Sequence, residues 1–184
     1  MKSDGARRRA CHLSKARAEV EDLASRGVVM AGNAFSSVLL LKGDPSQSER
    51  AAGRLLAGDD GKALRAALQA LGYAPEDWAG LATWDMRGGV LDAPLLREAV
   101  CVLDPATLVL CDGAAAQAVR EAYAQDLSLL ESFEEAMLAE GTVVQLAGMR
   151  VLALGGFAAA LGDARQKQLM WARLKLLPPL GEPY

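Results

Sequence analysis

A single aspartate at the end of an apolar run is the residue best placed to do chemistry. The stretch SVLLLKGDPSQSE loses its apolar character at Gly43, immediately before Asp44 and Pro45. A carboxylate at the mouth of a buried strand can activate a water molecule, and Ser46 and Gln47 would add polar contacts beside it. Gly43 lets the backbone approach a ligand closely because it has no side chain. The alternative is structural, since Asp-Pro also commonly starts a turn that caps the following residues.

Several other kinds of site are not supported. The segment GDDGK resembles a phosphate-binding loop only faintly, because Ala63 replaces the Ser or Thr that holds magnesium. No G-x-S-x-G motif is present, and His12, the only histidine, leaves no partner for a Ser-His-Asp triad. The three cysteines lie far apart, so we expect buried, reduced thiols, with no metal site and no cofactor. They are Cys11, Cys101 and Cys111.

Length and composition predict one domain. The chain has 184 residues, of which 52% are hydrophobic and 23% charged, which is enough for one well-buried core. No apolar run approaches the roughly 18 residues that a membrane span needs, so we expect no membrane association. The N-terminal arginine run is not followed by an apolar segment, which argues against a signal peptide. Together with the reduced thiols, this predicts a cytoplasmic protein.

Charge is unevenly distributed along the chain. Residues 1–17 carry a net charge of +5, whereas the whole chain carries −3, so residues 18–184 carry −8. An acidic body is not typical of a tight electrostatic binder of nucleic acid. The basic segment either adds phosphate contacts or is a solvated terminus, and the sequence leaves both interpretations open.

The pattern of elements predicts an α/β fold. Residues 37–42 form an apolar run without alternation, which is typical of a strand covered on both faces. Strands alternating with helices favour a three-layer α/β/α sandwich around a mostly parallel four-stranded sheet. We expect strands at residues 37–42, 79–84 and 107–111, a hairpin or bent strand at 142–146 and 150–154, and helices at 14–25, 59–72, 92–104, 114–123 and 163–177.

Ligands bind beyond the carboxyl ends of the strands in such sheets. This rule would gather four loops at one edge, and Asp44 lies on the first of them. The loops are residues 43–50, 85–89, 112–113 and 155–162.

Three longer segments resemble the uracil-DNA glycosylase superfamily, in particular its bacterial and archaeal iron–sulfur branch. They are GNAFSSVLLLKGDPSQSERAAGRLLAGDDGKALRAALQALG, LLREAVCVLDPATLVLCDGAAAQAV and DARQKQLMWARLKLL, the last containing Trp171. The resemblance implies a glycosylase-like domain over residues 28–178, preceded by a basic arm and helix at 1–27 and followed by a tail at 179–184. The matching positions are Gly32, Asn33, Pro45, Gly53, Arg54, Gly58, Gly61 and Leu64.

The family flips a uracil out of DNA and hydrolyses its N-glycosidic bond. By the resemblance, Asp44 coincides with the aspartate that orients the water in the superfamily's best-known branch. Leu56 replaces the phenylalanine that stacks on the base, and Ala82 replaces the asparagine that reads its edge. The histidine loop becomes Gly156-Phe157-Ala158, without its histidine.

The chain also differs from the family at two other groups of positions. Lys42 and Gly43 stand at the family's Gly-Glu pair, so that glutamate is lost. Met86 and Leu91 stand at positions of cluster cysteines, and Cys11 is at most a remnant. The resemblance therefore implies no iron–sulfur cluster in this chain.

Two functions remain open at this stage. The first is a divergent glycosylase with altered base excision, in which Leu56 and Phe157 sandwich a base near Asp44. Trp84 would then supply the lost stacking surface, unless it is a core residue. The second is an inactive glycosylase-like module that binds nucleic acid, a nucleotide or a protein partner.

Overall fold

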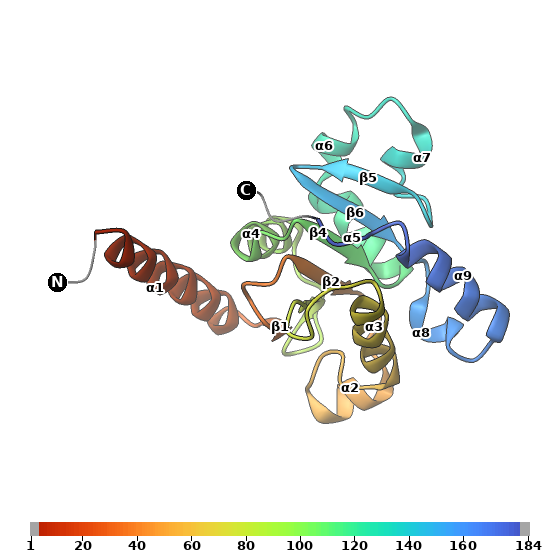
Figure 1. Ribbon diagram of the computed structural model, residues 1–184, viewed down its shortest axis with the longest axis horizontal. Coiled ribbons are helices and arrows are strands. Elements are labelled where there is room, and N and C mark those ends of the chain that lie inside the picture. The colour runs from red at the N-terminus through yellow and green to blue at the C-terminus, as the bar shows by residue number, and fades with distance from the viewer. Residues whose placement is uncertain (1–3, 181–184) are drawn as a thin grey trace.

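A six-stranded sheet forms the centre of the computed structural model, which describes residues 4–180 (Figure 1). The strand order is β1-β3-β2-β4-β6-β5, and the four central strands run parallel to one another. β1 and β5 pair antiparallel at the two edges. The strands are β1 (Val28–Gly32), β2 (Val38–Lys42), β3 (Ala79–Asp85), β4 (Thr107–Leu110), β5 (Val143–Leu146) and β6 (Met149–Ala153).

The predicted α/β class is confirmed, but the predicted number of four strands is wrong. β1 was not predicted from the sequence, which also left open whether β5 and β6 form a hairpin. They do form an antiparallel hairpin, in which β6 pairs with β4 and β5 continues the sheet outward. The sheet is therefore mixed at its edges and parallel at its centre.

The strands expected at residues 37–42, 79–84 and 107–111 are present as β2, β3 and β4 and lie next to one another in the sheet. β2 lies between β3 and β4 and is parallel to both. All five residues of β2 are buried, including Lys42 at its end. A strand covered on both faces needs no alternation of apolar and polar residues, which explains its uninterrupted apolar run.

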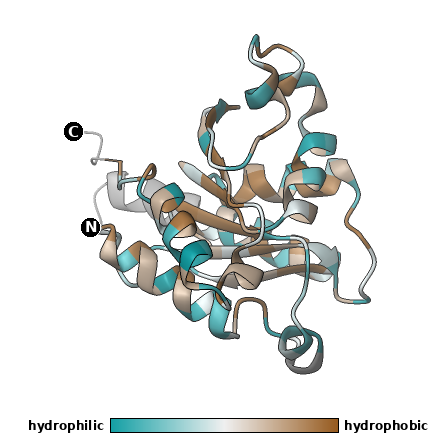
Figure 2. Ribbon diagram, turned by 90° about the vertical axis from the view of Figure 1, so that its right-hand side faces the viewer, coloured by the Kyte–Doolittle hydropathy of each residue, from teal (hydrophilic) through white to brown (hydrophobic). Residues whose placement is uncertain are grey.

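Helices cover both faces of the sheet, and the hydropathy colouring shows the apolar strands between them (Figure 2). Leu39 and Leu41 face a core shared with α1, α4, α5 and α6. Val38 and Leu40 face the opposite core, shared with α3, α8 and α9. The helices are α1 (Asp4–Ser25), α2 (Gln47–Ala52), α3 (Asp59–Ala70), α4 (Ala93–Leu103), α5 (Gly113–Ala122), α6 (Ala124–Leu127), α7 (Phe133–Ala136), α8 (Phe157–Ala160) and α9 (Ala164–Leu174).

The predicted starts of α4 and α9 agree with the N-caps in the structure. Asp92 and Asp163 accept hydrogen bonds from the first turns of α4 and α9, as Asx N-caps do. α9 ends at Leu174, before the predicted limit at residue 177. α1 is longer than the predicted 14–25 and begins at Asp4.

The cysteine prediction is partly wrong. Cys111 is buried at the end of β4, where burial raises the pKa of its thiol. Cys101 is exposed instead, because α4 turns this position away from the core. Cys11 lies outside the residues whose side chains are described.

No helix within residues 4–180 is long and apolar enough to cross a bilayer.

Candidate functional site

A cleft of about 850 Å³ opens at the carboxyl ends of β2 and β3. Its volume is within the usual range of small-molecule sites, roughly 300–1,000 Å³. The turn after β2, helix α2 and the turn after β3 form its walls. The lining includes Gly43, Asp44, Pro45, Glu49, Arg50, Arg54, Leu55, Thr83, Trp84, Asp85, Met86 and Arg87.

Asp112 holds the turn that carries Asp44. Its carboxylate accepts hydrogen bonds from the backbone N–H groups of Gly43 and Asp44, each at 3.0 Å, and also caps α5 through Ala115. Gly43 is required here, because a Cβ atom would lie only 2.3 Å from the backbone nitrogen of Ala115. The turn is therefore held in one position against the start of α5.

Asp44 itself is not a helix cap. Its side chain is 79% exposed, and Arg50 Nη2 lies 3.9 Å from its carboxylate. Ser46 caps α2 instead, in a capping box with Glu49. The structural alternative, in which Asp44 caps the following residues, is wrong, although the turn that starts at Asp44-Pro45 is present.

Trp84, near the end of β3, and Arg87, in the turn that follows, both line the cleft. Asp85 Oδ1 accepts hydrogen bonds from the backbone N–H groups of Arg87 and Gly89, both at 2.8 Å. Trp84 is half-buried, with part of its ring packed against the core. Trp84 thus packs on the core and also lines the cleft, and its role as a stacking surface stays a prediction.

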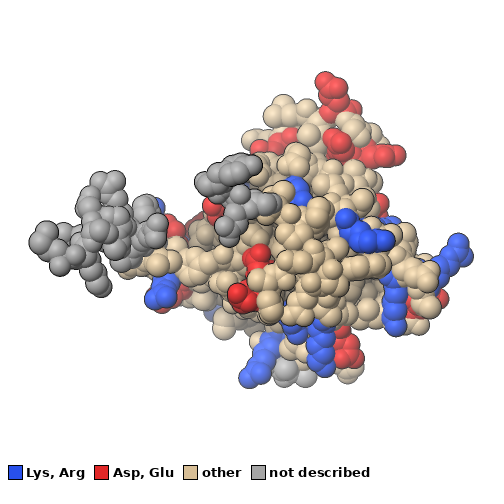
Figure 3. Space-filling model, in the orientation of Figure 1, with Lys and Arg blue, Asp and Glu red and all other residues tan. Residues whose placement is uncertain are grey.

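Basic side chains outnumber free acidic ones around the cleft. Arg50, Arg54 and Arg87 are exposed, and Lys and Arg side chains gather near α2 in the space-filling view (Figure 3). Asp44 and Asp85 oppose them, and Asp85 is already engaged by the backbone of its own turn. The cleft can therefore attract an anionic group in spite of the acidic body.

A buried ion cluster lies beneath the cleft at the end of β2. The Lys42 ammonium donates hydrogen bonds to Glu49, at 2.5 Å, and to Asp60. Burial alone would lower the pKa of Lys42, but the hydrogen bonds to Asp60 and Glu49 outweigh burial and raise this pKa above its ordinary value. A lysine held in its charged form is not a nucleophile, so the cluster has a structural role.

Glu49 also links this cluster to two backbone N–H groups. Its carboxylate also accepts hydrogen bonds from the N–H groups of Ser46, at 2.7 Å, and Leu56, at 2.6 Å. The cluster consequently ties the end of β2 to both α2 and α3. It holds one wall of the cleft in place.

The structure does not bring all predicted site residues into the cleft. Leu56 is buried in the core at φ +56°, and Leu55 lines the cleft in its place. Phe157 is also buried, and Gly156 pairs with Asp112 through an isolated bridge outside the lining. Gln47 and Ser46 start α2 and do not line the cleft. Gly43, Asp44, Pro45 and Trp84 are brought together.

Sequence reasoning missed the cluster and the arginines. Glu49 and Asp60 lie 7 and 18 residues after Lys42, so only the fold brings these charges together. One signal was available, because a lysine that ends a fully apolar strand needs buried counter-charges. The arginines gave no such signal, since exposed arginines are common on helices and in loops.

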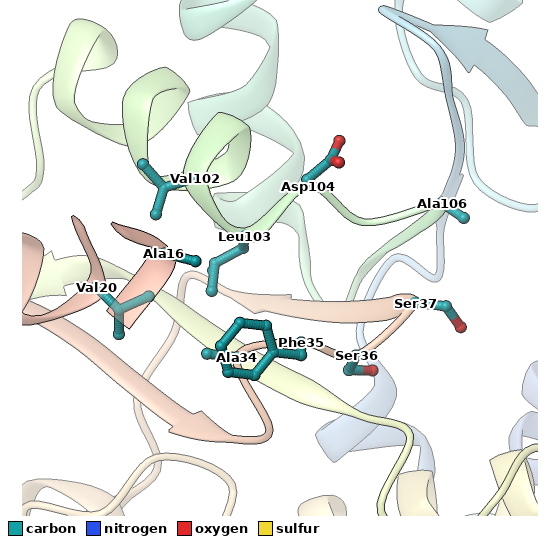
Figure 4. A pocket seen from close by; sticks show the side chains of 10 residues that line it. All are labelled: Ala16, Val20, Ala34, Phe35, Ser36, Ser37, Val102, Leu103, Asp104 and Ala106. Atoms are coloured by element: carbon teal, nitrogen blue, oxygen red, sulfur yellow. The ribbon is translucent and has the colours of Figure 1, made fainter. Parts of the chain in front are cut away.

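A second cavity of about 430 Å³ lies at the opposite edge of the sheet (Figure 4). Val20, Ala34 and Leu103 contribute apolar walls, and Ser36 and Ser37 lie at its rim, before the start of β2. The amino ends of the strands are not where ligands bind in parallel sheets. The cleft beside Asp44 is therefore the better candidate site.

Neither metal binding nor similarity to known proteins identifies what this site binds. Among the residues whose side chains the structure describes, 13–50 and 53–180, no three His, Cys, Asp or Glu are grouped so as to hold a metal ion. Comparison with protein families and with curated proteins finds no match.

Proposed function

We propose that this chain is a glycosylase-like module that binds a strand of DNA through the cleft at the ends of β2 and β3. The observation that carries the proposal is the combination of Trp84 with Arg50, Arg54 and Arg87 around one cleft. The resemblance to uracil-DNA glycosylases adds support, since β2, β3 and β4 are adjacent and parallel as it implies.

The physical basis is stacking together with phosphate neutralisation. A base stacked on an aromatic side chain contributes about 1–3 kcal/mol, and stacking tolerates any base because each has a π-face. Arginines beside the stacking surface neutralise phosphates, which makes binding dependent on salt. A single strand supplies both groups without the cost of unpairing a duplex.

Binding of a fluorescent single-stranded oligonucleotide, measured by anisotropy, tests this proposal. Arg54→Glu and Arg87→Glu should each weaken binding about tenfold or more at low salt, because each reverses one charge at the cleft. Arg165→Glu is the matched control, since Arg165 is exposed on α9, outside the cleft lining. Equal losses in all three variants, or no binding by the wild type, would contradict the proposal.

Base excision is the second candidate, favoured by one observation. Asp44 lines the cleft on a turn that Asp112 holds, so a water beside it would face any bound nucleotide. Against excision, the carboxylate is 79% exposed, and the loop at residues 156–158 lacks the histidine that would stabilise the leaving base. These two facts make binding without chemistry the better proposal.

A strand-cleavage assay on DNA containing uracil, hypoxanthine or xanthine separates the two functions. The binding proposal predicts no base release by the wild type. If base release is found, Asp44→Asn should lower its rate by about 10²–10⁴-fold, as expected for loss of a general base. A rate unchanged in that variant would exclude Asp44 as the base.

A further inference from the structure

An apolar surface remains uncovered at α6 and α7. Leu129 is 82% exposed, Phe133 77% and Met137 45%. Phe133 and Met137 lie one helical turn apart, since the Met137 N–H donates to the Phe133 carbonyl at 2.9 Å. Large exposed apolar residues that follow each other along one segment are typical of interaction sites. We call Leu129, Phe133 and Met137, with the exposed Glu131 and Glu134 between them, the α6–α7 patch.

The segment that carries this patch is acidic, and Arg120, which donates to the Met137 carbonyl at 3.1 Å, is a basic side chain at its edge. Residues 121–149 contain six Asp or Glu residues and no Lys, Arg or His. Acidic side chains gather at the upper right of the space-filling view, where α6 and α7 lie (Figure 3). Such a surface fits a basic partner that also carries apolar side chains.

Helix α1 combines basic and apolar side chains in this way. Its 22 residues give a length of about 33 Å, and it projects away from the body (Figure 1). Val20 and Leu23 pack on the first core, and Ala16 lines the small cavity (Figure 4). Leu13, one turn further out, is 47% exposed. The apolar stripe of α1 thus extends beyond the body that covers its inner half.

The outer half of α1 is also basic. Lys15 and Arg17 are exposed, and the sequence adds Arg7, Arg8 and Arg9, so that residues 1–17 carry +5. α1 contacts α4 and β1 of its own chain, whereas α6 and α7 lie toward the opposite side of the molecule. The helix therefore cannot reach the α6–α7 patch of the same chain in this conformation.

We propose that the outer half of α1 docks on the α6–α7 patch of a second copy of this chain. Charge complementarity selects this occupant, because the exposed Lys15 and Arg17 of α1 and the acidic α6–α7 patch lie at distant places on one chain. Leu13 would contact the apolar side chains, and Lys15 and Arg17 would face Glu131 and Glu134. Reciprocal exchange of α1 between two copies closes the assembly as a dimer. The proposal does not depend on DNA binding.

Sedimentation velocity of the full-length protein over a micromolar concentration series tests this contact. The wild type should self-associate at low salt and dissociate as salt screens the charges. Phe133→Ser should weaken association about tenfold or more, as loss of a central aromatic anchor does. Phe133 is exposed, so circular dichroism should show an unchanged fold.

Charge reversal supplies the sharper test. Lys15→Glu with Arg17→Glu should weaken association, and so should Glu131→Lys with Glu134→Lys. All four changes in one chain should restore association, because the charges again complement each other. Glu76→Lys is the matched control, since this exposed glutamate lies before β3, far in sequence from the patch.

Three results would overturn the proposal. The first is a wild type that stays monomeric over the whole series, and the second is a combined four-residue reversal that does not restore association. The third is an α1 reversal that leaves the sedimenting mass unchanged and instead weakens oligonucleotide binding. That outcome would assign the basic helix to nucleic acid.

Discussion

Lys42 is the residue on which the cleft wall depends most. It is buried together with Glu49 and Asp60, and its charge is balanced by theirs across a short hydrogen-bonded cluster. A buried ion pair adds little compared with an apolar core, but removing one partner leaves the others as unpaired buried charges. The cluster therefore fixes the positions of α2 and α3 relative to the end of β2.

Lys42→Met should lower the free energy of unfolding by about 3–5 kcal/mol, because it leaves two buried carboxylates without a cation. Lys62→Met is the control, since Lys62 pairs with Asp59 on the surface at 3.2 Å and with both side chains exposed. The control should change stability by less than about 1 kcal/mol. Urea unfolding of both variants measures this, and equal effects would mean that the cluster does not have this role.

Asp44 illustrates how far sequence reasoning reaches at this scale. The end of an apolar strand predicts the position of a carboxylate at the edge of a sheet, and Asp44 does line the cleft there. The sequence could not distinguish a capping role from a free side chain. That distinction depends on Ser46, which takes the cap, and on Asp112, which lies 68 residues away and holds the turn.

At the scale of elements, Asp77 joins the loops that precede β2 and β3. Its carboxylate accepts hydrogen bonds from Ser36 Oγ at 2.8 Å, Ser37 Oγ at 2.7 Å and Ser37 N–H at 2.7 Å. Burial alone would raise the pKa of Asp77, but these hydrogen bonds outweigh burial, so its pKa lies below the ordinary 3.8. The two adjacent strands are thus held together at their amino ends.

This lowered pKa predicts a pH dependence of stability. The contribution of Asp77 is complete above the ordinary pKa of 3.8 and is lost as the pH falls through the lower pKa of the folded state. Asp77→Asn should therefore be less stable than the wild type at neutral pH, and the difference should shrink below about pH 4. Glu76→Gln, at the neighbouring exposed position, should show no such change. A difference independent of pH in urea unfolding would contradict this reading.

The long elements could be predicted from sequence and the short ones could not. β2 and α3 carry strong signals, namely an unbroken apolar run and apolar residues at helical spacing closed by a glycine. α2, with six residues, is stabilised by a local capping box, and α6, α7 and α8 have four residues each. Such short helices bury few side chains, so their sequences show no clear pattern of apolar residues at helical spacing.

At the scale of the whole molecule, the edges of the sheet separate two kinds of surface. Parallel strands bring the turns after β2 and β3 together, and this places Trp84 beside Asp44 although 40 residues separate them. The sequence predicted this edge from the order of its elements. It could not predict that Leu56 and Phe157 turn into the core, because this depends on the packing of α3, α8 and α9.

NMR of the tryptophan indole N–H groups tests most directly whether this cleft binds a strand of DNA. Trp84 lines the cleft, Trp78 packs under Arg65, with its ring centroid 4.9 Å from the guanidinium, and Trp171 lies on α9. Trp84→Phe assigns the Trp84 signal. On titration with a short single-stranded oligonucleotide, the Trp84 signal should shift, while the positions of the Trp78 and Trp171 signals should not change. An unmoved Trp84 signal at saturating oligonucleotide, or a shift confined to Trp171, would contradict binding at this cleft.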